Sequence, residues 1–184
     1  MLIGGITIVS AALALGLCAG FGGFDGLSWL WVLPVSFAGS FLGLALLAFF
    51  FLWLMCQFVD QNKPQEHDNK FYRQMMYLYI DAIKTLGRVR VHTRGLEKTP
   101  TEGRFLLVCN HLDNTDPPLI LSAFKKSQLA FISKRENSDM FLVGDVMHKI
   151  MCQMINREND REALKTILKC IQLIKDDEVS IGVF

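Results

Sequence analysis

The chain has 184 residues, of which 51% are hydrophobic and 20% charged, with a formal net charge of +1. This near-neutral balance argues against nucleic-acid binding, because proteins that bind nucleic acids usually carry a strongly basic domain. The charge is unevenly distributed, since Asp25 is the one charged side chain in residues 1–59. The division predicts a membrane-anchoring segment followed by a water-soluble domain of roughly 120 residues, a usual size for one domain.

Two apolar runs make up the anchoring segment. The run over residues 2–24 is long enough to cross about 30 Å of hydrocarbon as a helix. No Lys or Arg precedes it, which weakens the alternative of a cleaved signal peptide. The second run covers residues 27–59 and is most apolar over residues 37–58. Three tryptophans suit anchoring at a membrane interface: Trp29, Trp31 and Trp53. With a turn at residues 22–26, the runs predict a helical hairpin that either spans the bilayer or enters it part-way.

Basic residues follow the second run, whereas the turn contains one acid and no base. The basic residues are Lys63, Lys70, Arg73, Lys84, Arg88, Arg90 and Arg94. Cytoplasmic flanks of membrane helices are enriched in Lys and Arg. The pattern therefore predicts a membrane protein whose domain after the hairpin is on the cytoplasmic side.

Residues 60–87 are predicted to be a linker that contains an amphipathic helix at Lys70–Leu86. Its apolar residues recur at steps of three and four, the spacing typical of one helix face. They are Tyr72, Met75, Met76, Tyr79, Ile83 and Leu86. Two interpretations stay open: the apolar face covers the sheet of the following domain, or the helix lies on the membrane with Lys70, Arg73 and Lys84 near lipid phosphates.

Strand and helix patterns alternate over residues 88–184. Strands are predicted at residues 88–93, 104–109, 129–133, 151–155 and 179–184. Helices are predicted at residues 119–124, around 140–150, and at Asp160–Lys175 with Leu164, Ile167, Leu168, Ile171 and Ile174 on one face. The alternation predicts an α/β domain with a central mixed sheet flanked by helices. The last strand ends the sequence with nothing after it to cover or continue the sheet, so we expect the chain to be a fragment of a longer protein.

The cysteines and histidines are scattered along the chain. The five cysteines form no C-x-x-C pair, and the four histidines do not cluster with them. This distribution favours neither a disulfide framework nor a zinc site. We expect free, mostly buried thiols in a reducing compartment.

The stretch most suggestive of chemistry is C-N-H-L-D-N-T-D-P-P, residues 109–118, between a predicted strand and a predicted helix. Open α/β sheets bind ligands at the carboxyl ends of their strands. A neutral imidazole at His111 can take a proton from a hydroxyl, and Asp116 can fix its tautomer if the loop folds back. Cys109 precedes the motif within the strand, so the substrate is expected to bring the hydroxyl. The alternative is that Asp116 caps the helix, because Pro117 follows it.

The pattern Asn110-His111-x4-Asp116 resembles the N-H-x4-D motif of the glycerolipid acyltransferases, which include the PlsC-type 1-acyl-sn-glycerol-3-phosphate acyltransferases. Four further segments resemble the family in its order. They are Val91-x3-Gly95-Leu96-Glu97, a strand and G-x-E turn; Lys134-Arg135-Glu136, a K-x-E segment; Met154-Ile155-Asn156-Arg157, the second motif; and residues 180–184, the strand before the third motif, P-E-G-T-R. The resemblance covers about residues 89–184.

Two departures from the family pattern affect what can be expected. Asp113 stands where the family often has serine, a departure that concerns the detail of the loop and neither His111 nor Asp116. The sequence also ends at Phe184, where P-E-G-T-R is expected to begin. The glutamate and arginine of that motif help to bind glycerol phosphate in the family. The chain by itself is therefore expected to be weakly active or inactive, and the complete protein to be the enzyme.

The resemblance implies a role for each site residue. His111 takes the proton of the sn-2 hydroxyl of 1-acyl-sn-glycerol 3-phosphate (lysophosphatidate), and Asp116 orients His111. The hydroxyl oxygen attacks the thioester of acyl-CoA or acyl-ACP, the co-substrate, and no metal or other cofactor is implied. Arg157 binds the acceptor phosphate, for which a guanidinium is suited, unless it is only a surface residue. Asn110 positions the loop, and Lys134 adds positive potential or is simply solvated or lipid-facing.

Three functional hypotheses follow. The first is a lysophosphatidate acyltransferase of phospholipid biosynthesis, with membrane lipids, lysophosphatidate and the acyl donor as partners. The second is a family member that uses glycerol 3-phosphate or another lysophospholipid, and the third is a non-catalytic membrane-anchored scaffold. The predicted organisation is a membrane hairpin at residues 1–59, a linker helix at 60–87 and an acyltransferase domain at 88–184 without its C-terminal part.

Overall fold

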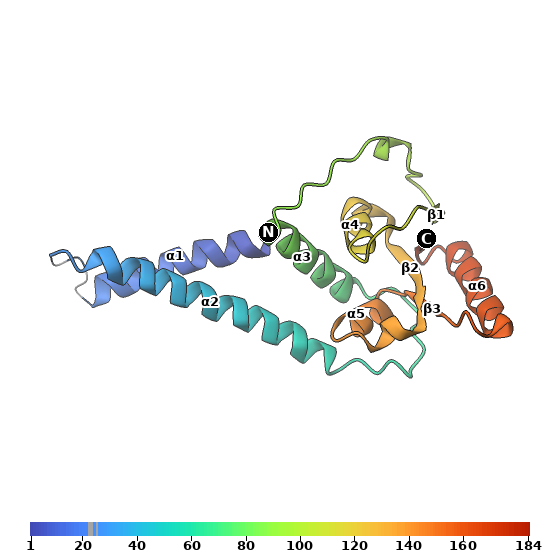
Figure 1. Cartoon of the computed structure of the whole chain (residues 1–184), viewed down its shortest axis with the longest axis horizontal. Helices are drawn as coiled ribbons and strands as arrows, with labels where there is room; N and C mark the ends of the chain where they lie inside the picture. Colours follow the sequence, from blue (N-terminus) through green and yellow to red (C-terminus); the bar gives the residue numbers. More distant parts are fainter. Residues whose placement is uncertain (22–23, 25) are drawn as a thin grey trace. The chain divides into compact units, whose positions relative to one another are not determined.

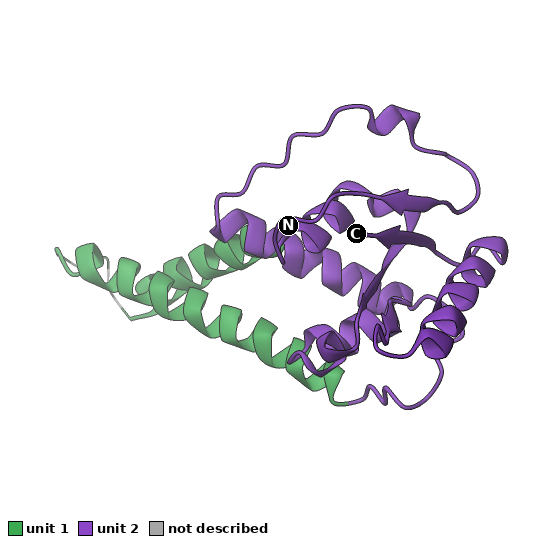
Figure 2. Ribbon diagram, turned by 45° about the vertical axis from the view of Figure 1, so that its right-hand side comes forward, with its two compact units in different colours: residues 1–57 green, residues 58–184 purple. Residues whose placement is uncertain are grey.

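The computed structural model describes the chain except for residues 22–23 and 25, and it separates into two compact units, Met1–Gln57 and Phe58–Phe184 (Figures 1 and 2). The predicted turn at residues 22–26 lies partly outside the described residues. The helix predicted for the linker belongs to the second unit. The functional assignment of residues 1–59, 60–87 and 88–184 stays a prediction.

The first unit consists of two long apolar helices, α1 (Leu2–Gly20) and α2 (Trp29–Cys56), which pack against each other. The buried residues of α1 are spaced four apart, at Ile6, Ser10, Ala14 and Cys18. Small side chains at such positions let two helices approach closely. Both helices are long and apolar enough to cross a membrane, judged by length and composition alone.

The second unit is an α/β domain whose elements follow one another in Figure 1. Its helices are α3 (Lys70–Leu86), α4 (Asp116–Ala123), α5 (Val143–Lys149) and α6 (Asp160–Lys175), with short 3-10 turns at Leu96–Lys98, Lys125–Ser127 and Arg135–Asp139. Its strands are β1 (Leu106–Val108), β2 (Leu129–Lys134), β3 (Gln153–Ile155) and β4 (Ser180–Val183). They form a sheet in the order β1-β4-β2-β3.

The sheet is parallel among the described residues, so the expected mixed sheet is wrong. A helix follows each of β1, β2 and β3. Such a crossover returns the chain to the end of the sheet at which the previous strand began, so the next strand runs parallel to it. The strand predicted at residues 88–93 is also wrong. That segment has no regular secondary structure, with Val89 and Val91 exposed. An alternating pattern forms a strand only where a neighbouring strand accepts its hydrogen bonds.

The last strand, β4, lies inside the sheet and not at an uncovered edge. Gly182 pairs with Leu107 of β1 on one side and with Phe131 of β2 on the other. Val179 and Ile181 are completely buried. A continuous apolar run is typical of a parallel strand that is covered on both faces.

Helix α3 has the predicted bounds, but its apolar stripe is split. Tyr72 and Met75 are buried, whereas Ile83 and Leu86 are each 67% exposed. The hypothesis that Arg73 lies near lipid phosphates is wrong, because its side chain is 3% exposed.

Arg73 instead joins three parts of the second unit. Its Nε lies 2.7 Å from an oxygen of the buried Asp68 carboxylate. Nη1 and Nη2 donate to the carbonyls of Leu129 and Ile150, at 2.8 and 3.0 Å. The guanidinium thereby satisfies the carbonyl of the first residue of β2 and that of the residue that follows α5, a structural role that charge and spacing alone did not reveal.

Helix α6 also has the predicted bounds, and Asn159 caps it by accepting from the N–H groups of Arg161 and Glu162. Its buried residues are Cys170 and Leu173, which border the predicted apolar face. Of the five residues predicted for that face, Ile174 is half-buried and four are exposed: Leu164, Ile167, Leu168 and Ile171. The sheet thus covers one flank of the helix.

Candidate active site

The loop from β1 to α4 carries the proposed His–Asp pair. The N–H of Cys109 still donates to Val183 O at 3.1 Å, which continues the pairing of β1 with β4 by one residue. The chain then turns at Asp113, whose Oδ1 accepts from the N–H of Thr115 at 2.8 Å and whose carbonyl accepts from the N–H of Asp116 at 3.0 Å. This local turn, of the kind that Asp side chains favour, reverses the chain before α4 begins.

The turn folds Asp116 back toward His111. One carboxylate oxygen, Oδ2, accepts from the N–H groups of Leu112 and Asp113 at 2.8 and 2.9 Å. The same oxygen lies 3.2 Å from Nδ1 of His111. The alternative that Asp116 caps α4 is wrong, because Thr115 occupies the N-cap position and the carboxylate is directed at the preceding loop.

The loop amides keep the Asp116 carboxylate charged. Hydrogen bonds from the N–H groups of Asp113 and Leu112, followed by the contact with His111, lower the pKa of Asp116. An ionised acceptor at Nδ1 favours the tautomer of His111 with hydrogen on Nδ1, which leaves the Nε2 lone pair free. The side chains of His111 and Asp116 are 38% and 28% exposed, so a reactant can reach them. The arrangement can therefore accept a proton at Nε2.

Two aromatic residues that the sequence interpretation did not single out lie beside the imidazole. The ring centroid of Phe184 is 4.5 Å from that of His111, and the ring of Phe131 stacks on the ring of Phe184 with 4.9 Å between centroids. The sequence did not reveal this contact, because Phe131 lies in β2 and Phe184 directly follows β4, and the sequence does not specify that these strands are neighbours.

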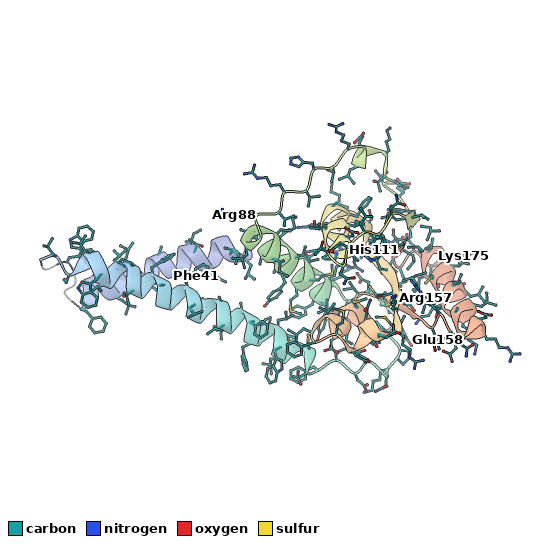
Figure 3. The ribbon with its side chains drawn as sticks, in the orientation of Figure 1. Phe41, Arg88, His111, Arg157, Glu158 and Lys175 are labelled. Atoms are coloured by element: carbon teal, nitrogen blue, oxygen red, sulfur yellow. The ribbon has the colours of Figure 1, made fainter. Side chains whose placement is uncertain are left out.

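The remaining predicted site residues lie along one edge of the sheet. Parallel strands end at the same edge, so Asn110 and Arg157, which follow β1 and β3, and Lys134, which ends β2, are all placed there. All three are exposed. Lys134 is two strands and Arg157 three strands from the strand that leads to His111. Figure 3 labels both His111 and Arg157. At the usual spacing between neighbouring strands, β1 and β3 are about 14 Å apart.

Cys109 is poorly suited to act as a nucleophile. Burial, with a smaller effect of the nearby Asp116 charge, raises the pKa of its thiol, and the thiolate is the reactive form of cysteine. All five cysteines are free, as expected. In the part of the chain that the structure describes, no group of three or more His, Cys, Asp or Glu side chains is arranged to hold a metal ion.

A comparison with known protein families identifies the class of protein. The sequence model of the family described as Acyltransferase matches residues 90–184, which is just over half of the chain and includes every proposed site residue. The chain belongs to this acyltransferase family, which confirms the resemblance found in its motifs.

Two curated relatives have the name "Probable 1-acyl-sn-glycerol-3-phosphate acyltransferase". The one from Mycoplasma pneumoniae is 32% identical over 123 residues, covering 64% of this chain and 43% of the relative. The one from Mycoplasma genitalium is 33% identical over 126 residues, covering 66% and 44%. The chain thus spans less than half the length of these relatives. No solved structure matches it.

Proposed function

We propose that the protein transfers a fatty acyl group from acyl-CoA or acyl-ACP to the sn-2 hydroxyl of lysophosphatidate, which gives phosphatidate. The observation that carries the proposal is the 3.2 Å contact between His111 Nδ1 and Asp116 Oδ2 in a chain that belongs to the acyltransferase family. The names of the two mycoplasma relatives support 1-acyl-sn-glycerol 3-phosphate as the acceptor.

In the proposed reaction, His111 acts as the general base. Its Nε2 accepts the proton of the sn-2 hydroxyl while the hydroxyl oxygen attacks the thioester carbonyl carbon. The ester C–O bond forms, the C–S bond breaks, and the departing thiolate takes the proton back from the imidazolium. Asp116 stabilises the imidazolium between these two proton transfers and holds the ring in place.

Three more residues have proposed binding roles at the same edge of the sheet. Arg157 binds the acceptor phosphate, because a guanidinium presents paired donors to phosphate oxygens. The extended Arg157 side chain and the glycerol phosphate together bridge the separation of about 14 Å between β1 and β3. Lys134 adds positive potential, and Asn110 positions the loop. Because a thioester is already an activated donor, the proposal assigns no step to a metal or other cofactor.

The two helices of the first unit support a membrane location. Lysophosphatidate and phosphatidate are lipids, and α1 and α2 have the length and composition of membrane spans. We infer that they anchor the protein as a hairpin. The basic residues that follow α2 favour a cytoplasmic position for the second unit.

A thioester-consumption assay with a panel of acceptors tests the proposal. The complete gene product in proteoliposomes is given acyl-CoA or acyl-ACP and, in separate reactions, lysophosphatidate, glycerol 3-phosphate or lysophosphatidylcholine. We expect thiol release that depends on lysophosphatidate. Faster release with glycerol 3-phosphate or lysophosphatidylcholine would assign the enzyme to that acceptor, and release with none of them would favour the scaffold hypothesis.

A further inference from the structure

His111 is held from two directions. Asp116 meets its Nδ1 at 3.2 Å, while the Phe184 ring lies against the imidazole with 4.5 Å between centroids and 33° between planes. The contact with Asp116 restrains the position of Nδ1, and the contact with Phe184 restrains the orientation of the imidazole plane. A general base must present its lone pair in a fixed direction, because small displacements of reacting groups cost much of the rate.

The position of Phe184 depends in turn on Phe131. These two rings are nearly parallel, with 4.9 Å between centroids and 8° between planes. Phe131 is 3% exposed, and its N–H donates to Sγ of the buried Cys152 at 3.3 Å. Phe131 is therefore a fixed platform for Phe184.

Gly182 makes this stack possible. It pairs in register with Phe131, and Phe184, which directly follows β4, stacks its ring on that of Phe131. A Cβ atom on Gly182 would lie 2.6 Å from Cδ1 of Phe131, closer than carbon atoms approach each other without a bond. Because Gly182 has no side chain, the Phe131 ring can lie over β4 and contact the ring of Phe184.

We propose that Phe184 is a positioning residue for His111: its ring, supported by Phe131 above Gly182, holds the imidazole in the plane that joins Nδ1 to Asp116. The inference rests on the proposed function, since the orientation of His111 matters for acyl transfer only if His111 is the base. Without the Phe184 ring, the His111 side chain would be restrained chiefly by Asp116 and would sample other rotamers.

The contact is tested by NMR of histidine labelled with carbon-13 in the full chain in detergent micelles. Protons above the face of an aromatic ring resonate upfield, so Phe184→Leu is expected to move the imidazole C–H signals of His111 downfield. Phe184→Tyr keeps the ring and should leave them in place, whereas Gly182→Ala should move them by displacing Phe131. The matched control is Phe124→Leu, which removes a ring that pairs with Phe105. Assignment of the His111 signals comes from His111→Gln.

The positioning role is tested by steady-state kinetics on the complete gene product. Phe184→Leu should lower kcat for acyl transfer by about 10- to 100-fold, the effect expected of a misplaced catalytic group. The KM for the acyl donor should stay nearly unchanged, and Phe184→Tyr should restore kcat.

The results separate the inference from the proposed function. Unchanged His111 signals in Phe184→Leu would overturn the inference whatever the activity. Shifted signals with an unchanged kcat would also overturn it, because the contact would then have no positioning effect. If the wild-type protein transfers no acyl group, the proposed function fails and with it the positioning role, while the NMR result still decides whether the ring contact exists.

Discussion

At the scale of single residues, the His111–Asp116 pair depends on a loop that is preorganised by its own backbone. The Asp116 oxygen that faces His111 also accepts two loop N–H groups, and these amides are the main reason that the pKa of Asp116 is low. Replacement of either partner therefore disturbs the charge or the orientation of the other.

Asp116→Asn tests this coupling. The amide keeps the size of the side chain but removes the negative charge that stabilises the imidazolium and selects the tautomer with hydrogen on Nδ1. We expect kcat for acyl transfer to fall by about 100-fold or more, since general-base catalysis contributes on this scale.

The matched control is Asp113→Asn in the same loop. Asn can still accept from the N–H of Thr115 through its side-chain oxygen, as Asp113 does. Activity near that of the wild type is expected, measured in the same assay. Equal losses in Asp116→Asn and Asp113→Asn would indicate that loop structure, and not the carboxylate next to His111, matters.

The Arg73–Asp68 ion pair tests the support of the second unit. Both side chains are buried, at 3% and 4% exposure, so Arg73→Met leaves an unpaired buried carboxylate. We expect a loss of about 3–5 kcal/mol in the free energy of unfolding. Lys63→Met removes an ion pair with Asp60 that is largely exposed, and it should leave the free energy of unfolding nearly unchanged.

The readout for these variants is thiol labelling during denaturation. Burial raises the pKa of Cys152 to about 11 and that of Cys170 to about 11, so neither thiol reacts readily while the second unit is folded. If Cys152 and Cys170 become labelled at similar denaturant concentrations in Arg73→Met and Lys63→Met, the assigned role of Arg73 is contradicted.

At the scale of secondary-structure elements, two histidines make opposite contributions to stability as the pH changes. Burial and the neighbouring Lys149 lower the pKa of His148 in α5, and the hydrogen bond that His67 donates to the Glu178 carboxylate raises the pKa of His67. The stabilising effect of neutral His148 is present above pH ~6.5 and is lost as the pH falls toward its folded pKa. That of charged His67 is present below pH ~6.5 and is lost as the pH rises through its folded pKa.

Thermal unfolding at pH 7.5 and 5.5 measures these contributions. The decrease in Tm on acidification should be smaller in His148→Gln than in the wild type, and it should be larger in His67→Gln. His67 is exposed, so its replacement should alter the pH dependence of Tm less than the replacement of His148. If the pH dependence of Tm in both variants equals that of the wild type, His148 and His67 have the same pKa in the folded and the unfolded protein. That result would contradict the prediction.

The sequence predicted some elements of the fold well because their signals are local. The bounds of α3 and α6 agree with the apolar periodicity and with Asn caps at residues 69 and 159. The segment at residues 88–93 was wrongly predicted as a strand because strand formation depends on a distant partner. The interior position of β4 was not predictable either, since the order of strands follows from crossovers and not from local pattern.

The same distinction applies to the candidate site. Spacing and chemistry identified His111 and Asp116, which the structure brings together. They did not identify the amides of Leu112 and Asp113 or the Phe184 ring, because these contacts arise from loop geometry and strand order. The binding roles of Asn110, Lys134 and Arg157 stay predictions.

At the scale of the whole molecule, the proposed function requires a membrane anchor. We expect the chain to remain with membranes during alkaline carbonate extraction, because α1 and α2 present mostly apolar residues. A form that lacks residues 1–57 should be released into the supernatant. If carbonate releases the whole chain into the supernatant as readily as the form that lacks residues 1–57, the anchoring role of the first unit is contradicted.

The measurement that most directly tests the central claim is acyl transfer to lysophosphatidate by the complete gene product and its His111→Ala variant. The account predicts that His111→Ala abolishes the transfer of radiolabelled acyl groups to phosphatidate, because no other group replaces Nε2 as the base, while membrane association is retained. Retained transfer in His111→Ala would contradict the assigned mechanism.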